Sequence, residues 1–157
     1  MSEIVIINSA KSCCVSGHRR MQGDLDVNKL KQTFLQLIDD GVDTFLVGMA
    51  LGFDALCFRI LEEIRNTKNI KIIACIPCKN QDYKYTESQR QEYQRMLKSA
   101  NEQVWVGDVY TPYCMHKRNR FMVDNSYCLV AYLRQDKSGT NTTVRYAKEL
   151  GRKIILL

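Results

Sequence analysis

Four short segments of the chain combine glycine with side chains that can bind phosphate or sugar. The first, Ser16-Gly17-His18-Arg19-Arg20, follows the apolar segment 13–15. Arginine forms paired hydrogen bonds with phosphate, and glycine lets a ligand approach the backbone. We therefore expect Gly17, His18 and Arg19 to contact an anionic ligand. The alternative is a surface turn whose arginines are solvated.

The second segment is Gly48-Met49-Ala50-Leu51-Gly52-Phe53-Asp54, between an apolar run and a helical pattern. A strand that ends at glycine and restarts as a helix leaves free N–H groups at the positive end of the helix dipole, which attracts anions. The spacing matches neither the dinucleotide fingerprint nor the Walker loop. We expect Gly48, Met49 and Gly52 to bind an anion or nucleotide, and Asp54 to face ribose hydroxyls or Arg19. Alternatively, the glycines serve only a tight turn.

The third segment, Ser138-Gly139-Thr140-Asn141-Thr142-Thr143, is rich in hydroxyls and precedes or opens the last helical pattern. Hydroxyl, amide and helix N-terminal N–H groups all donate to phosphate oxygens. The plainer alternative is that Thr140 or Asn141 only caps the helix. The ligand-binding residues expected here are Gly139, Thr140, Asn141, Thr142 and Thr143.

The fourth segment is the basic stretch 114–120, followed by Asp124 and Ser126. If the stretch is helical, Arg118 shares a face with Met115 and Met122. An arginine held against apolar groups indicates a binding or catalytic role, whereas a solvated basic face is the ordinary alternative.

The cysteines favour packing over metal or redox chemistry. Cys75-Ile76-Pro77-Cys78 has the spacing of such motifs, and Cys114 and His116 could complete a metal site. A redox pair normally opens a helix, however, whereas Cys75 lies inside an apolar strand pattern. Seven cysteines, an odd number, also argue for reduced thiols rather than a disulfide framework. We expect no metal and no cofactor.

Composition limits the class of protein. The chain has 157 residues, a net charge of +6 and 45% hydrophobic residues, which predicts one domain over residues 1–157 and favours an anionic partner. The basic residues are dispersed, so nucleic acid is allowed rather than indicated. There is no signal-like leader and no apolar run of the roughly 20 residues that a membrane helix needs, so we expect a cytoplasmic protein without a membrane partner.

Alternating patterns predict the elements that position these segments. We expect strands at 13–15, 44–47, 70–76, 104–106, 129–133 and 154–157, with 4–7 either a further strand or a lead-in. Helices are expected at 27–41, from 53 onward, and at 87–100, 114–125 and 142–150. This predicts an α/β fold, a single Rossmann-like three-layer domain with a mainly parallel sheet flanked by helices. The loops 16–20, 48–54 and 137–143 would meet at the carboxyl ends of the strands, where such sheets bind ligands.

Taken in this order, the motifs resemble the SLOG superfamily, most closely its YpsA-like branch. The resemblance runs from Cys13 to the end of the chain and includes 14–19, 48–54, 76–78, 115–124 and 139–147. The superfamily contains the LOG phosphoribohydrolases, the DNA-processing DprA proteins and proposed sensors of nucleotide-derived ligands. The resemblance implies a Rossmann-like fold and, since relatives are often dimers or larger, a homo-oligomer.

The resemblance also bears on catalysis. Met115-His116-Lys117-Arg118 is similar to the LOG segment that carries the catalytic arginine, which makes Arg118 the counterpart. In the LOG motif Gly-Gly-x-Gly-Thr-x-x-Glu, Gly139-Thr140 matches, but Thr143 stands at the glutamate position. Cleavage of an N-glycosidic bond needs a carboxylate to stabilise positive charge or activate water. Asp54, Asp124 or Glu87 could supply one from another loop.

These observations leave three functions open. The leading one is binding or sensing of a nucleotide or an ADP-ribose-type ligand. The second is a nucleoside-monophosphate N-glycosidase with a relocated carboxylate and Arg118, Asp54 and Asp124 as candidate catalytic residues. The third is DprA-like binding of single-stranded DNA.

Overall fold

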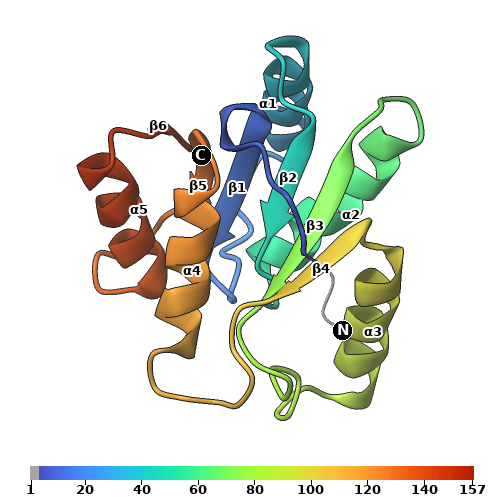
Figure 1. Ribbon diagram of the computed structural model, residues 1–157, viewed down its shortest axis with the longest axis vertical. Coiled ribbons are helices and arrows are strands. Elements are labelled where there is room, and N and C mark those ends of the chain that lie inside the picture. The colour runs from blue at the N-terminus through green and yellow to red at the C-terminus, as the bar shows by residue number, and fades with distance from the viewer. Residues whose placement is uncertain (1–3) are drawn as a thin grey trace.

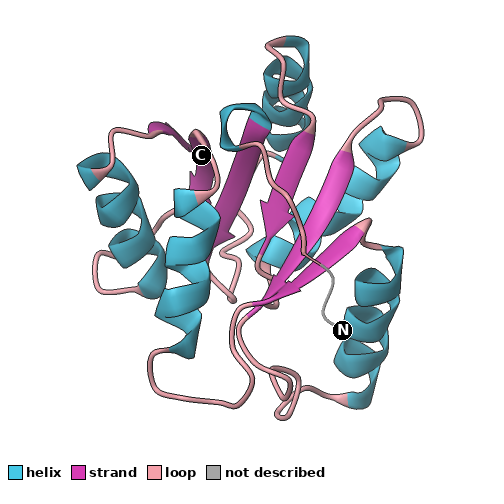
Figure 2. Ribbon diagram, viewed as in Figure 1, coloured by secondary structure: helices cyan, strands magenta, loops and turns pink. Residues whose placement is uncertain are grey.

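The computed structural model describes residues 4–157, which are built around one parallel β-sheet (Figures 1 and 2). All five strand pairs are parallel, which confirms the predicted α/β fold and extends "mainly parallel" to every pair. The order across the sheet is β4-β3-β2-β1-β5-β6. The strands are β1 (Ser12–Gly17), β2 (Thr44–Val47), β3 (Lys71–Ile76), β4 (Glu102–Trp105), β5 (Cys128–Tyr132) and β6 (Lys153–Leu156).

Helices cover both faces of the sheet, in two layers with separate apolar cores. The first layer packs through residues such as Phe34, Phe58 and Met96, and the second through Met122 and Val144. Figure 1 shows α4 and α5 together on the side of the sheet opposite α1 and α2. The first layer is α1 (Val27–Asp39), α2 (Phe53–Arg65) and α3 (Glu87–Ser99), and the second is α4 (Cys114–Asp124) and α5 (Gly139–Glu149).

The inner strands β1, β2, β3 and β5 are almost entirely buried because helices cover both faces of the sheet. Along β1, the side chains of Cys13 and Val15 join the core beneath α1–α3, whereas Cys14 joins the core beneath α4 and α5. On β3, Ala74 and Cys75 divide between the two cores in the same way. Successive side chains of a strand point to opposite faces of the sheet, and this alternation determines which strand residues contact each helical layer.

Most predicted elements are confirmed, with two corrections. Helix α5 starts at Gly139 rather than at 142, because the Ser138 hydroxyl accepts the Asn141 N–H at 3.1 Å and caps the helix. Neither Thr140 nor Asn141 is therefore the N-cap. Residues 4–7 form no strand; Val5 and Ile7 pack against the core of the second layer, and a 3-10 turn, η1 (Ser9–Lys11), leads into β1.

The connection order places a switch point beside β1. From β1 the chain passes through β2 and β3 to β4 in one direction, then returns through α4 to β5, on the other side of β1. The helices that follow β1 and β5 lie on opposite faces, so the loops at these strand ends diverge. In open parallel sheets, this divergence opens the crevice in which ligands bind.

Candidate functional site

A cavity of about 250 Å³ lies at the carboxyl ends of the strands. It is lined by the end of β1 and the loop after it, the start of α2, the first half of α4 and the start of α5. Segments that are far apart in the sequence therefore meet around one space, which we call the central cavity. Of the residues expected from the sequence, it is lined by Gly17, His18, Arg19, Asp54, Arg118, Gly139 and Thr140.

The other expected residues lie outside its walls. The Thr143 hydroxyl donates to the Gly139 carbonyl at 2.9 Å, and the Asn141 amide donates to the Asp136 carbonyl at 2.6 Å, so both hold the first turns of α5. Thr142 donates to Ser138 in the same way. Asp124, at the far end of α4, accepts the Tyr146 hydroxyl at 2.5 Å. Gly48, Met49 and Gly52 also do not line the cavity.

Arg118 enters the cavity wall from α4 and is only 5% exposed. Its guanidinium donates to the Gly48 carbonyl through Nη1 and to Asn119 Oδ1 through Nε at 2.8 Å. Nη2 lies 3.8 Å from the sulfur of Met115. Burial lowers the pKa of Arg118, against the charge of Asp54. The arginine therefore fastens α4 to the end of β2.

Asp54, on the first turn of α2, places a buried carboxyl beside this guanidinium. It is 6% exposed, and its Oδ2 accepts the Ala50 N–H at 3.2 Å. Burial raises the pKa of Asp54 to about 6, while the charge of Arg118 and the Ala50 N–H act in the opposite direction. A carboxyl with such a pKa can exchange a proton near neutral pH.

The turn between β2 and α2 brings these groups together. A Cβ added to Gly48 would lie 2.8 Å from Arg118 Nη1 and 2.9 Å from Asp54 Oδ2, so only glycine leaves room for both. Met49 and Gly52 adopt φ of 65° and 78°, in the left-handed region. The turn thus positions the two charges, and one of its N–H groups, that of Ala50, is taken by Asp54 rather than left for an external anion.

The same turn is docked on the loop after β1. The Phe53 N–H donates to the His18 carbonyl at 3.1 Å, and a Cβ on Gly52 would lie 2.2 Å from the Arg19 carbonyl oxygen. Gly17 is covered by the Phe53 ring, which a Cβ would meet at 2.4 Å. These close approaches explain why glycine stands at positions 17 and 52.

A polar network that sequence reasoning missed secures the loop after β1 to the end of β5. His18 Nε2 accepts the Arg134 N–H at 2.7 Å, and burial, followed by the charge of Arg134, lowers the pKa of His18. Asp24 accepts Tyr132 Oη and Arg134 Nε, each at 2.6 Å. The Arg134 guanidinium also lies 4.2 Å above the Tyr132 ring. His18 therefore acts as an acceptor that holds its loop in place.

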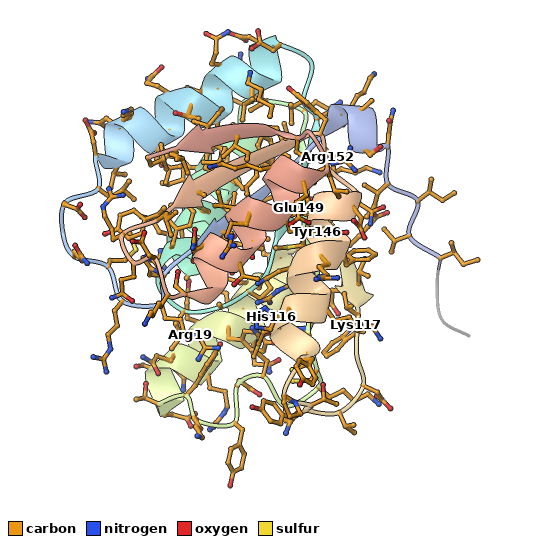
Figure 3. All side chains as sticks on the ribbon, turned by 90° about the vertical axis from the view of Figure 1, so that its left-hand side faces the viewer. Arg19, His116, Lys117, Tyr146, Glu149 and Arg152 are labelled. Carbon is orange, nitrogen blue, oxygen red and sulfur yellow. The ribbon has the colours of Figure 1, made fainter. Side chains whose placement is uncertain are left out.

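Arg19 is the exposed cation of the site. It lines both the central cavity and a larger groove of about 940 Å³, whose walls include Met21, Leu56, Tyr85 and Met96. Within residues 4–157, its side chain forms no hydrogen bond or ion pair with another residue of the chain. In Figure 3 Arg19 is labelled at about the same height as His116 and Lys117, in the lower half of the molecule. The guanidinium is therefore available to an anion from solution.

The start of α5 supplies another part of the cavity wall. Gly139 and Thr140 line the cavity at the helix N-terminus, where N–H groups and the helix dipole favour an anion. Ser16 adds a hydroxyl from the end of β1.

Over the described part of the chain, no group of three or more His, Cys, Asp or Glu is arranged to hold a metal ion. No helix there has both the length and the apolar character required to cross a membrane.

A family model described as the YspA SLOG family, YpsA, matches residues 23–153. The chain belongs to this SLOG family. The predicted resemblance is thereby confirmed, and the matched range includes the lining residues of the central cavity except those at the end of β1 and in the loop after it, residues 15–19.

Two curated bacterial relatives agree with this membership. The uncharacterized SPbeta prophage-derived protein YoqJ of Bacillus subtilis strain 168 is 32% identical over 139 residues, covering 77% of this chain and 81% of YoqJ. The UPF0398 protein BH1768 of Halalkalibacterium halodurans is 24% identical over 126 residues, covering 78% of this chain and 65% of that protein.

Two solved structures share the fold. The DNA processing protein A (DprA) of Streptococcus pneumoniae has a TM-score of 0.67, and that of Helicobacter pylori, described by its single-stranded DNA binding mode, has 0.66. Each is 18% identical and covers 94% of this SLOG chain, which spans 50% and 65% of the two DprA chains. At this identity the likeness establishes the fold alone.

Proposed function

We propose that this SLOG protein binds a nucleotide or an ADP-ribose-type ligand at the central cavity and acts as a sensor or regulator. The observation that carries the proposal is the meeting of the exposed Arg19 with the N-terminus of α5 across one cavity. Guanidinium, helix N–H groups and hydroxyls are the groups that bind phosphate. Thr140 and Ser16 supply the hydroxyls.

The sizes of the two spaces support the same proposal. A cavity of about 250 Å³ suits a phosphate and its sugar, whereas the adjoining groove of about 940 Å³ is large enough for a base. Arg19 and Ala50 line both spaces, so a ligand can extend from one to the other. In this arrangement Asp54 faces the sugar.

Isothermal titration with AMP, ADP-ribose and NAD tests the proposal. At least one ligand is expected to bind, and Arg19→Ala is expected to weaken it by roughly tenfold or more, since a charge-assisted bond to phosphate is lost. Arg145→Ala is the matched control, because Arg145 is exposed on α5 and outside every cavity described above. If the folded protein binds none of these three ligands, the proposal is rejected.

A second candidate is cleavage of the N-glycosidic bond of a nucleoside monophosphate. It is favoured by Asp54, which lines the cavity as a carboxyl with a pKa of about 6, whereas Asp124 lies at the far end of α4 and Glu87 at the start of α3. Incubation with nucleoside monophosphates would release free base, and Asp54→Asn would abolish the release while leaving binding. No base released at high protein concentration would exclude this activity.

Single-stranded DNA binding is supported only by the fold shared with DprA and by the net charge of +6. It predicts affinity that falls steeply with salt, since bound phosphates release counterions. Absent or salt-insensitive binding to an oligonucleotide would reject it.

A further inference from the structure

A second groove, with a volume of about 530 Å³, runs between α4 and α5. Its walls come from Tyr113, the first turns of α4 and the first turns of α5. Asn119 lines both this α4–α5 groove and the central cavity, so the two spaces adjoin. On α5, Thr140 lines the cavity and Thr143 the groove, about one helical turn farther along. A ligand in the cavity could therefore extend into the groove.

The α4–α5 groove is cationic. Lys117 and Arg120 line it beside His116, and no carboxylate does. Neither Lys117 nor Arg120 forms an ion pair with a carboxylate of residues 4–157. Figure 3 shows α4 and α5 side by side, with His116 and Lys117 toward the lower end of α4. The nearby Asp124 already accepts the Tyr146 hydroxyl. The groove thus keeps its positive charge for an anion outside the chain.

Aromatic rings accompany these cations. Tyr113 is 75% exposed and lines the groove just before α4 begins. The Arg120 guanidinium lies 4.9 Å from the centre of the Tyr146 ring, which places its charge along the groove wall. Exposed rings beside cationic side chains are the combination that binds a base together with its phosphate.

We propose that the α4–α5 groove binds a second nucleoside phosphate, so that the ligand is a dinucleotide or a longer strand. This inference rests on the proposed function, because the first nucleotide occupies the central cavity. Lys117 and Arg120 neutralise the second phosphate, Asn119 lies where the ligand passes between the two spaces, and Tyr113 stacks on the second base.

Titration with AMP and with the linear dinucleotide pApA tests the inference. The wild-type protein is expected to bind pApA about tenfold more tightly than AMP, because a further phosphate is neutralised. The double variant Lys117→Gln/Arg120→Gln loses this advantage and binds AMP within about twofold of wild type. Lys148→Gln, an exposed lysine of α5 outside the groove, leaves both affinities unchanged.

The outcomes separate the two proposals. Equal wild-type affinity for AMP and pApA overturns the groove inference and leaves the proposed function intact. So does a double variant that loses AMP binding, because the groove residues would then hold the first phosphate. No binding of AMP, pApA, ADP-ribose or NAD overturns both proposals, whereas binding of ADP-ribose or NAD alone overturns only the groove inference. If pApA binds more tightly than AMP, a decamer of the same nucleotide distinguishes the two kinds of ligand. A decamer that binds more tightly than pApA identifies a strand as the ligand. A decamer that binds no more tightly identifies a free dinucleotide.

Discussion

At the scale of single residues, the central cavity depends on two buried charges. Arg118 and Asp54 are 5% and 6% exposed, and the guanidinium contacts Gly48, Asn119 and Met115. Burial of a charged pair costs desolvation free energy that the attraction only partly offsets. The pKa of Asp54, raised to about 6, reflects that cost.

Asp54 makes the stability of the protein depend on pH. Its pKa is about 6 in the folded state and about 3.9 in an unfolded chain, so the folded state binds the proton more tightly. This contribution to stability is full below about pH 4 and is lost as the pH rises through 6. Asp54→Asn removes it, and the free energy of unfolding of the variant relative to wild type is expected to rise by about 2 kcal/mol between pH 4.5 and 7.5.

Urea unfolding at both pH values measures that difference. Hydrogen bonds lower the pKa values of other carboxyls, such as Asp24 and Glu62. These carboxyls titrate alike in both proteins, so their contributions to the stability difference cancel. Parallel stability curves for wild type and variant would contradict the assignment to Asp54.

Residue types and spacing could predict which cavity residues come together, because the ends of parallel strands share one edge of the sheet. Gly17, Arg19, Asp54 and Gly139 converge for this reason, although their ligand stays a prediction. The Asp24 network could not be foreseen. Its partners Tyr132 and Arg134 are 108 and 110 positions away, and nothing in the local sequence marks them.

At the scale of elements, the turn between β2 and α2 is the joint between the two helical layers. Its Gly48 carbonyl accepts from Arg118 of α4 and, at 3.3 Å, from Gln81 in the loop after β3. Elements on both faces of the sheet therefore converge on one peptide group. The sequence marked this turn through its glycines but not the direction in which its carbonyl points.

Gly48→Ala is expected to destabilise the protein by about 1–3 kcal/mol, the usual cost of overpacking a filled interior. The added Cβ would lie within 2.9 Å of both Arg118 and Asp54, which cannot both move aside without losing their bonds. Gly139→Ala is the control, since its Cβ would meet nothing within 4 Å. Thermal unfolding compares the two variants, and equal melting temperatures would show that the turn tolerates a side chain.

The loop after β1 is a second joint at this scale. Tyr132→Phe removes the hydroxyl that donates to Asp24 at 2.6 Å and accepts the Gln22 N–H at 3.2 Å. The variant is expected to lose about 1–2 kcal/mol of the free energy that holds the loop closed. This loss should appear as faster local opening, because only the loop is released. Hydrogen exchange over residues 18–26 is expected to accelerate while exchange in β3 stays unchanged. Uniform acceleration in both segments would place the effect on global unfolding instead.

At the scale of the whole molecule, an apolar core lies on each face of the sheet and all seven cysteines are buried. Burial raises the pKa of the Cys14 thiol to about 12 and raises those of Cys13 and Cys57. Thiols of this kind react only when the structure opens.

A thiol-reactive chromogenic disulfide is therefore expected to label no cysteine rapidly in the native protein and all seven after denaturation. Native labelling should follow the rate of opening as the temperature rises. One or two thiols that react at once would instead point to an accessible redox pair, such as Cys75 and Cys78.

The walls of the central cavity come from four separate parts of the chain: residues 15–19, Ala50 with Asp54, three residues of α4 and residues 139–140. A chain that is still being synthesised lacks the last wall until most of its length has emerged, and loop closures over such separations are slow and entropically costly. The complete cavity is thus absent until α5 has packed against the rest of the fold. The proposed ligand would bind only the complete fold, so a higher ligand concentration is expected to protect more of the protein from proteolysis.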